Sequence, residues 1–219
     1  EPELHDEELP SYDEVNLPGY RERHEHTPVV SYCIYQIARR FQTITPSAID
    51  TLHRPRYRVS ARRSSLFSKK ADFILTRVPA GRATALGECK ETNVATMSFD
   101  KHGKLPWMPR ATISHITSEK SYPMASPNFH DWKFMIDTEP FVWTITDRPA
   151  SLILVERLSE SIVARFSYST VGTCATRGAE IGRLDIYGGS RSEDQDFIEL
   201  VLASCQIAID HYKSTGRHY

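Results

Sequence analysis

The side chains best suited to chemistry in this sequence are seven cations that crowd into a stretch of seventeen residues. They are Arg54, Arg56, Arg58, Arg62, Arg63, Lys69 and Lys70. Arg56 and Arg58 would share one face of an extended strand, with the later cations in the loop that follows. Each cation near a membrane surface attracts anionic lipid by about 1 kcal/mol. We therefore expect a phospholipid-binding site here, the alternative being a solvated face that is balanced by the acidic segment at residues 1–26.

A second candidate site lies in the first 26 residues, where seven of the first fourteen are Asp or Glu. So acidic a segment cannot bury enough apolar surface to fold, and we expect a flexible arm at 1–26. Within it the pattern Leu-Pro-x-Tyr occurs twice, as Leu9, Pro10 and Tyr12 and again as Leu17, Pro18 and Tyr20. The pattern resembles the Pro-Pro-x-Tyr ligands of WW domains, in which proline pre-orders the backbone. The arm is thus predicted to recruit a WW-domain protein such as a ubiquitin ligase, unless the repeat arose by chance.

Patterns typical of enzymes are weak. The segment 188–192 places Ser190 among small residues but lacks the G-x-S-x-G spacing of a nucleophile elbow. His102, His115 and His130 have no spacing that ties them to a cysteine or a carboxylate. We expect no catalytic residues, no metal and no cofactor.

Composition limits the remaining classes of function. The 219 residues include 27 basic and 28 acidic side chains, so no overall charge favours nucleic-acid binding. The four cysteines are far apart and form no C-x-x-C pair, which predicts free thiols in a reducing compartment such as the cytoplasm. The sequence contains no run of 18 apolar residues, so it predicts no membrane-spanning helix.

Short alternating or apolar runs separated by turn residues predict strands from residue 29 onward. The predicted strands are 32–38, 57–61, 72–78, 85–89, 94–99, 111–117, 132–136, 141–145, 152–157, 161–168 and 182–187. In 111–117, Ile113 and His115 share one face. We expect ten to twelve strands in one domain, 27–219.

The last element, 194–213, is predicted to be a helix that is apolar on all sides, with Ser192 and Gln195 as a capping box. Such a helix must be buried, and about twelve strands can close around one. The sequence therefore predicts a mainly β fold: a closed antiparallel barrel of about twelve strands around a buried C-terminal helix. If the barrel were not filled by the helix, a carrier of small apolar ligands would be the alternative.

Several short patterns across residues 29–212 resemble the tubby C-terminal-like superfamily, which includes the LURP-one-related proteins and phospholipid scramblases. They are RYRV at 56–59, WTI at 143–145, LVER at 154–157 and IVARF at 162–166, followed by the apolar helix. The chain is most similar to the fungal members. The resemblance implies a twelve-stranded barrel around a central helix and, from the tubby proteins, a basic surface site for phosphoinositide headgroups. We thus expect a non-catalytic cytoplasmic protein, peripheral at a membrane.

Overall fold

The computed structural model describes residues 27–47, 56–62, 71–79, 91–100, 108–146, 151–189, 191–192 and 194–214. Within these ranges the chain forms twelve strands, one short 3-10 helix and one α-helix. The strands are β1 Pro28–Ala38, β2 Phe41–Pro46, β3 Arg56–Ala61, β4 Phe73–Val78, β5 Thr92–Phe99, β6 Arg110–His115, β7 Lys120–Ala125, β8 Trp132–Ile136, β9 Glu139–Thr146, β10 Ser151–Glu156, β11 Ser161–Tyr168 and β12 Glu180–Tyr187. The helices are η2 Gly172–Cys174 and α1 Gln195–Ser214.

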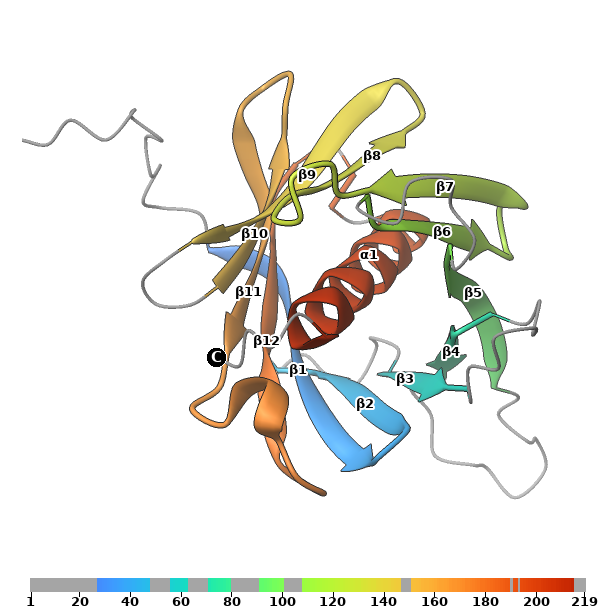
Figure 1. The fold of residues 1–219 in the computed structure, drawn as a ribbon, viewed down its shortest axis with the longest axis vertical. Helices are drawn as coiled ribbons and strands as arrows, with labels where there is room; N and C mark the ends of the chain where they lie inside the picture. Colours follow the sequence, from blue (N-terminus) through green and yellow to red (C-terminus); the bar gives the residue numbers. More distant parts are fainter. Residues whose placement is uncertain are drawn as a thin grey trace, which may run out of the picture.

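Each strand pairs with its neighbours in the sequence, and β12 pairs back to β1, which closes the barrel. All pairings are antiparallel, and α1 runs through the middle of the ring (Figure 1). Closure leaves no strand edge open to other chains. The predicted fold class, a closed barrel around a C-terminal helix, is confirmed.

Two of the twelve strands are absent from the sequence-based prediction. The strand β2 follows β1 after only two residues, and β7 contains Pro123, which lacks the N–H that a central strand needs. The structure tolerates Pro123 because β7 pairs fully with β6 but has a single registered pair with β8, between Ala125 and Lys133. The predicted strand at 85–89 lies outside the described residues.

Alternation along the strands sends one face of each to α1. In β8, Trp132, Phe134 and Ile136 are buried while the two residues between them are exposed. Trp132 lies directly opposite Trp143 of β9, and both are fully buried. Cross-strand aromatic pairs of this kind supply much of the buried area of a barrel.

The helix is buried over most of its surface: fifteen of its twenty residues are buried, from Phe197 to Tyr212. The predicted capping box is wrong. The Asp196 N–H donates to the side chain of Asp194, whereas the hydroxyl of Ser192 is engaged with the backbone of Gly189. The helix starts too late for Ser192 to reach its free N–H groups, so Asp194 caps them.

A hydrogen bond in the core fixes the helix against β9. The indole Nε1–H of Trp143 donates to Ser204 Oγ at 2.9 Å, and this hydroxyl donates to the carbonyl of Val201. Both side chains are fully buried, so no water can replace the hydroxyl as acceptor. The indole therefore depends on one residue of α1.

We expect Ser204→Ala to lower the free energy of unfolding by about 1–3 kcal/mol, because it leaves a buried N–H without a partner. Urea denaturation measures the change. Ser214→Ala is the matched control: its hydroxyl also donates three residues back, to His211, but it lies on the exposed last turn. An equal cost for the two variants would show that the indole bond contributes nothing.

Candidate functional sites

One end of the barrel gathers three segments around the β1–β2 turn. The Gln36 N–H donates to the carbonyl of Ala179 at 2.9 Å, and the Gly178 N–H donates to the carbonyl of Gln36 at 2.6 Å. On the other side, the Ala61 N–H donates to the carbonyl of Arg40 at 2.8 Å. The turn, the end of β3 and the connection between β11 and β12 are thus held side by side; the turn and the connection lie at the bottom of Figure 1.

These segments form what we call the basic-apolar tip: Arg39, Arg40, Arg62 and Arg177 with Ile37, Phe41 and Val171. The three apolar residues are 42–47% exposed. Residues 36–41, 60–62 and 169–180 contain one acidic residue, Glu180, and a second, Asp72, lies beside Arg62, whose N–H donates to the Asp72 carbonyl at 2.8 Å. Among the described residues, none of these four arginines makes an ion pair. The tip therefore combines unneutralised positive charge with exposed apolar side chains.

The predicted lipid-binding cations are only partly described. Arg56 and Arg58 are exposed on the same face of β3, and Arg62 follows at its end, where it joins the tip. Arg58 is neutralised by Glu91 at 3.0 Å, which makes it the weakest candidate of the three. The other predicted cations, Arg54, Arg63, Lys69 and Lys70, lie outside the described residues. So do Leu9, Pro10, Tyr12, Leu17, Pro18 and Tyr20 of the arm.

A different cluster lies inside the barrel, at the start of α1. Glu199 is fully buried, and its Oε1 is 2.5 Å from the guanidinium of Arg77 and accepts a 3.2 Å bond from the hydroxyl of Tyr57. Gln195, one turn earlier, bonds to both Tyr57 and Glu199. Burial raises the pKa of Tyr57, so its hydroxyl stays a donor. The partners come from β3, β4 and α1, which places one carboxylate at the centre of a converging polar network.

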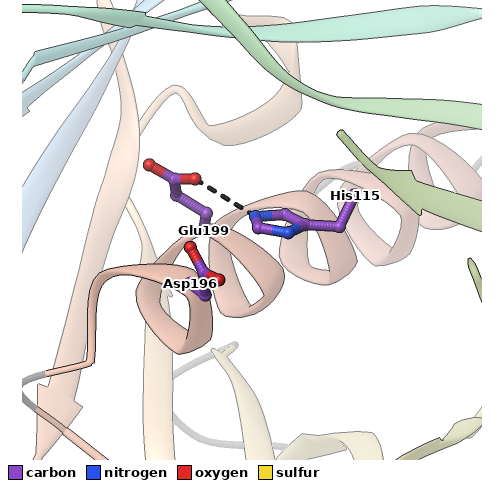
Figure 2. A group of neighbouring side chains, drawn as sticks. All are labelled: His115, Asp196 and Glu199. Carbon is purple, nitrogen blue, oxygen red and sulfur yellow. Dashed lines mark hydrogen bonds and ion pairs between the residues drawn. The ribbon is translucent and has the colours of Figure 1, made fainter. Parts of the chain in front are cut away.

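The second oxygen of the same carboxylate faces a histidine. His115 of β6 is buried, with Nε2 3.2 Å from Glu199 Oε2 and Nδ1 2.8 Å from Ser118 Oγ. Figure 2 shows His115 reaching toward Asp196 and Glu199, which lie three residues apart on α1. One ligand-type atom from each of these three residues lies within 4.8 Å of the others. A nitrogen and two carboxylate oxygens at this spacing are suited to holding a metal ion.

Polar residues continue along one side of the buried helix. Gln195, Glu199, Gln206 and Asp210 recur at spacings of four, seven and four, which places them on one stripe. Burial raises the pKa of Asp210 to about 6, against the opposing charge of Lys213 and with a small contribution from Asp72. The prediction of a helix that is apolar on all sides is therefore wrong, because one stripe of α1 is polar. Within the stripe, Gln195 and Glu199 bond to residues of the barrel wall and Asp210 has a raised pKa, whereas Gln206 Oε1 is buried without a hydrogen-bond partner among the described residues.

Sequence reasoning missed the interior cluster because His115 and Glu199 are 84 positions apart. Two signals were present. His115 shares a face with Ile113, which points inward, and Glu199 is the one charged residue in the apolar run of the helix. A buried carboxylate requires a partner, so the inward-facing polar residues of the strands were the candidates.

The chain matches no family model, no curated protein and no solved structure. In the part of the chain that the structure describes, no helix is both long enough and apolar enough to cross a membrane. The three described cysteines, Cys33, Cys174 and Cys205, are free.

Removing the guanidinium that neutralises Glu199 should be costly. We expect Arg77→Met to lower the free energy of unfolding by about 3–5 kcal/mol, because a buried carboxylate loses its counter-charge. Denaturant unfolding measures the loss. Arg58→Met is the matched control, since it breaks an exposed pair with Glu91 and should cost less than about 1 kcal/mol. Similar costs for the two variants would contradict a buried charge at Glu199.

Asp210 should make the stability depend on pH in acid. Its pKa of about 6 in the folded protein exceeds the value of about 3.9 expected when unfolded, so the folded state holds the proton more tightly. The contribution of Asp210 to the free energy of unfolding is therefore greatest below pH 4, falls as the pH rises to about 6, and stays constant above that. Asp210→Asn should therefore unfold at a higher temperature than the parent at pH 7.5, and the difference should vanish near pH 4.

Thermal melts across this pH range measure the effect. Asp137→Asn is an opposite-sign control, because its bond to Lys120 lowers the pKa of Asp137, and any contribution is lost as the pH falls. A constant difference between Asp210→Asn and the parent from pH 4 to 7.5 would contradict the raised pKa.

Proposed function

We propose that this protein is a non-catalytic domain that docks on anionic phospholipid membranes through its basic-apolar tip. The observation that carries the proposal is the joint exposure of Ile37 and Phe41 beside Arg39 and Arg40 on one tight turn. Moving the exposed apolar surface of Ile37 and Phe41 from water into a membrane would be favourable. The lipid headgroup region can accept the rings and aliphatic chains, and its phosphates can accept the guanidinium groups.

Charge supports lipid as the occupant of this surface. Four arginines without ion pairs among the described residues produce a local positive field, although the whole chain has a net charge of −1. Arginine forms bidentate hydrogen bonds with phosphate, and its charge favours lipids with a net negative charge over zwitterionic ones. The attraction is short-ranged in salt, so only groups that approach within about 10 Å contribute.

The tip lies at the end of a solid barrel. Because α1 fills the interior of the described barrel, we do not propose the small-ligand carrier that an unfilled barrel would have suggested. The closed wall holds the β1–β2 turn in a fixed position, so little ordering entropy is lost when the turn meets a membrane. A rigid, pre-exposed tip suits reversible docking.

The proposal extends to family and place in the cell. Membership in the tubby C-terminal-like superfamily and a cytoplasmic, membrane-peripheral location remain predictions, as does recruitment of a WW-domain protein by the arm. The fold, a twelve-stranded barrel around a helix, is of the kind that the resemblance implies. A lipid-binding role agrees with the basic surface site of the tubby proteins.

Co-sedimentation with vesicles tests the proposal. We expect the protein to pellet with vesicles of phosphatidylcholine containing about one-fifth phosphatidylserine or phosphatidylinositol bisphosphate, and not with phosphatidylcholine alone. Changing Arg39 and Arg40 to Ala should weaken binding by about 25-fold, from about 1 kcal/mol per cation. The double change of Ile37 and Phe41 to Ser should also weaken vesicle binding. Because this loss comes from apolar insertion and not from charge, it should not depend on salt.

A matched control comes from β8, where Lys133 and Met135 are also exposed but face away from the core. Changing Lys133 to Ala and Met135 to Ser alters a similar cation and a similar apolar surface, and binding should be kept. Equal sedimentation with neutral and anionic vesicles, or equal loss in the β8 and tip variants, would refute docking through the tip.

A further inference from the structure

We infer that His115, Asp196 and Glu199 form a site for a divalent transition-metal ion, with Zn²⁺ the best fit, at the end of the barrel where α1 begins. This site is independent of the membrane-docking proposal, since it uses inward-facing residues and none of the tip. The inference rests on the three ligand atoms that converge there, on the additional contacts of Glu199 and His115, and on the charge of the cluster.

The ligand atoms are already close to coordination spacing. Ligands about 2.0–2.2 Å from a tetrahedral zinc ion lie about 3.4 Å from one another. His115 Nε2 and Glu199 Oε2 are 3.2 Å apart, and Asp196 contributes an oxygen within 4.8 Å of both. A small rotation of the Asp196 side chain, which is half-buried, would close the third side. Three protein ligands would leave a fourth position for water.

The two oxygens of Glu199 have different partners. Arg77 and Tyr57 bond to Oε1, whereas Oε2 lies 3.2 Å from His115 Nε2. A metal bound to Oε2 would therefore leave the ion pair with Arg77 intact, and Arg77 and Tyr57 would hold the carboxylate in place. Such outer contacts are common where carboxylates bind metals.

The histidine is also set up to present Nε2. His115 Nδ1 lies 2.8 Å from Ser118 Oγ, which can accept from an Nδ1–H, and 3.4 Å from the backbone nitrogen of Ser118, whose N–H donates to an unprotonated Nδ1. In the metal-free protein the ring can instead carry its proton on Nε2 and donate it to Glu199. Metal binding would move this proton to Nδ1, so the neutral ring exchanges one tautomer for the other and releases no net proton. Ser118 would then orient the ring as a supporting acceptor.

Charge favours a cation over an anion at this position. Two carboxylates against Arg77 leave an excess of one negative charge when His115 is neutral. Arg77 and the positive end of α1 oppose a cation, so we expect weaker binding than at a closed zinc site with four protein ligands. One imidazole with two carboxylates suits Zn²⁺ or Mn²⁺ better than Mg²⁺ or Ca²⁺, which prefer oxygen alone.

The ion can reach the cluster from solvent. The side chain of Arg77 is 30% exposed and Asp196 is half-buried, while His115 and Glu199 lie just behind them, fully buried. The buried ligands would keep competing water away, and the exposed ones would form the entry.

Titration of the full chain, first stripped with EDTA, tests the site. We expect ZnCl₂ to raise the melting temperature and to give calorimetric heat that saturates near one ion per chain, with MnCl₂ weaker and MgCl₂ without effect at equal concentration. Asp196→Asn should abolish the high-affinity phase. The Asp196 carboxylate accepts no hydrogen bond from the described residues, so the variant keeps the Arg77–Glu199 pair and should fold.

Asp194→Asn is the matched control: it removes the same charge two residues away, keeps the oxygen that caps α1, and should bind Zn²⁺ like the parent. Ser118→Ala should weaken binding by about tenfold or more through the loss of the Nδ1 acceptor. Absence of a saturable phase in the parent would overturn the inference. Identical Zn²⁺ binding by Asp196→Asn and the parent would also overturn it, because the ion would then be on other histidines.

Discussion

Glu199 places a negative charge inside the barrel, near the start of α1, and three surrounding strands each direct one side chain toward it. A lone carboxylate in such surroundings would cost several kcal/mol. Arg77 of β4 forms an ion pair with this carboxylate, and the hydroxyl of Tyr57 on β3 donates a hydrogen bond to it. A ring nitrogen of His115 on β6 contacts its other oxygen. Because each of these side chains must point inward, the register of three strands is fixed relative to one residue of α1.

The same requirement fixes how α1 sits in the ring. An apolar helix in an apolar barrel could rotate or slide by a turn with little change in buried area. The Glu199 network at one end and the bond from Trp143 to Ser204 in the middle each allow only one orientation. At the far end, the hydroxyl of Tyr212 donates to the carbonyl of His130, which ties the last turn to the loop before β8. Polar contacts therefore specify the packing, while apolar burial supplies most of its free energy.

How much of this could be read from the sequence depends on whether the signal is local. Alternation in 132–136 and the length of the apolar run in 194–213 are local patterns, and they predicted strands, a buried helix and the closed barrel. Pro123 hid a strand because the weak pairing of β7 with β8 that accommodates it is a property of the assembled sheet. The pairing of His115 with Glu199 was hidden for the same reason, since only closure of the barrel brings them together. Arg58 illustrates the opposite error. The sequence places its charge in the predicted lipid site, but in the fold Glu91 neutralises it in an ion pair.

The strand β3 and its continuation take part in both candidate sites. Comparing the inward-facing residues with the outward-facing ones supports the proposal that the tip is a binding surface. Tyr57 faces inward and serves the Glu199 network, whereas Arg58 and Arg62 face solvent on the same strand and just beyond its end. The inward residue is required by the fold, because removing it would leave a buried group short of a partner. Arg62, Arg39, Arg40 and Arg177 satisfy no such need in the described structure, and placing like charges together slightly opposes folding. Positive charge that the fold does not use, beside apolar side chains that it does not bury, is better explained by an external binding partner than by stability.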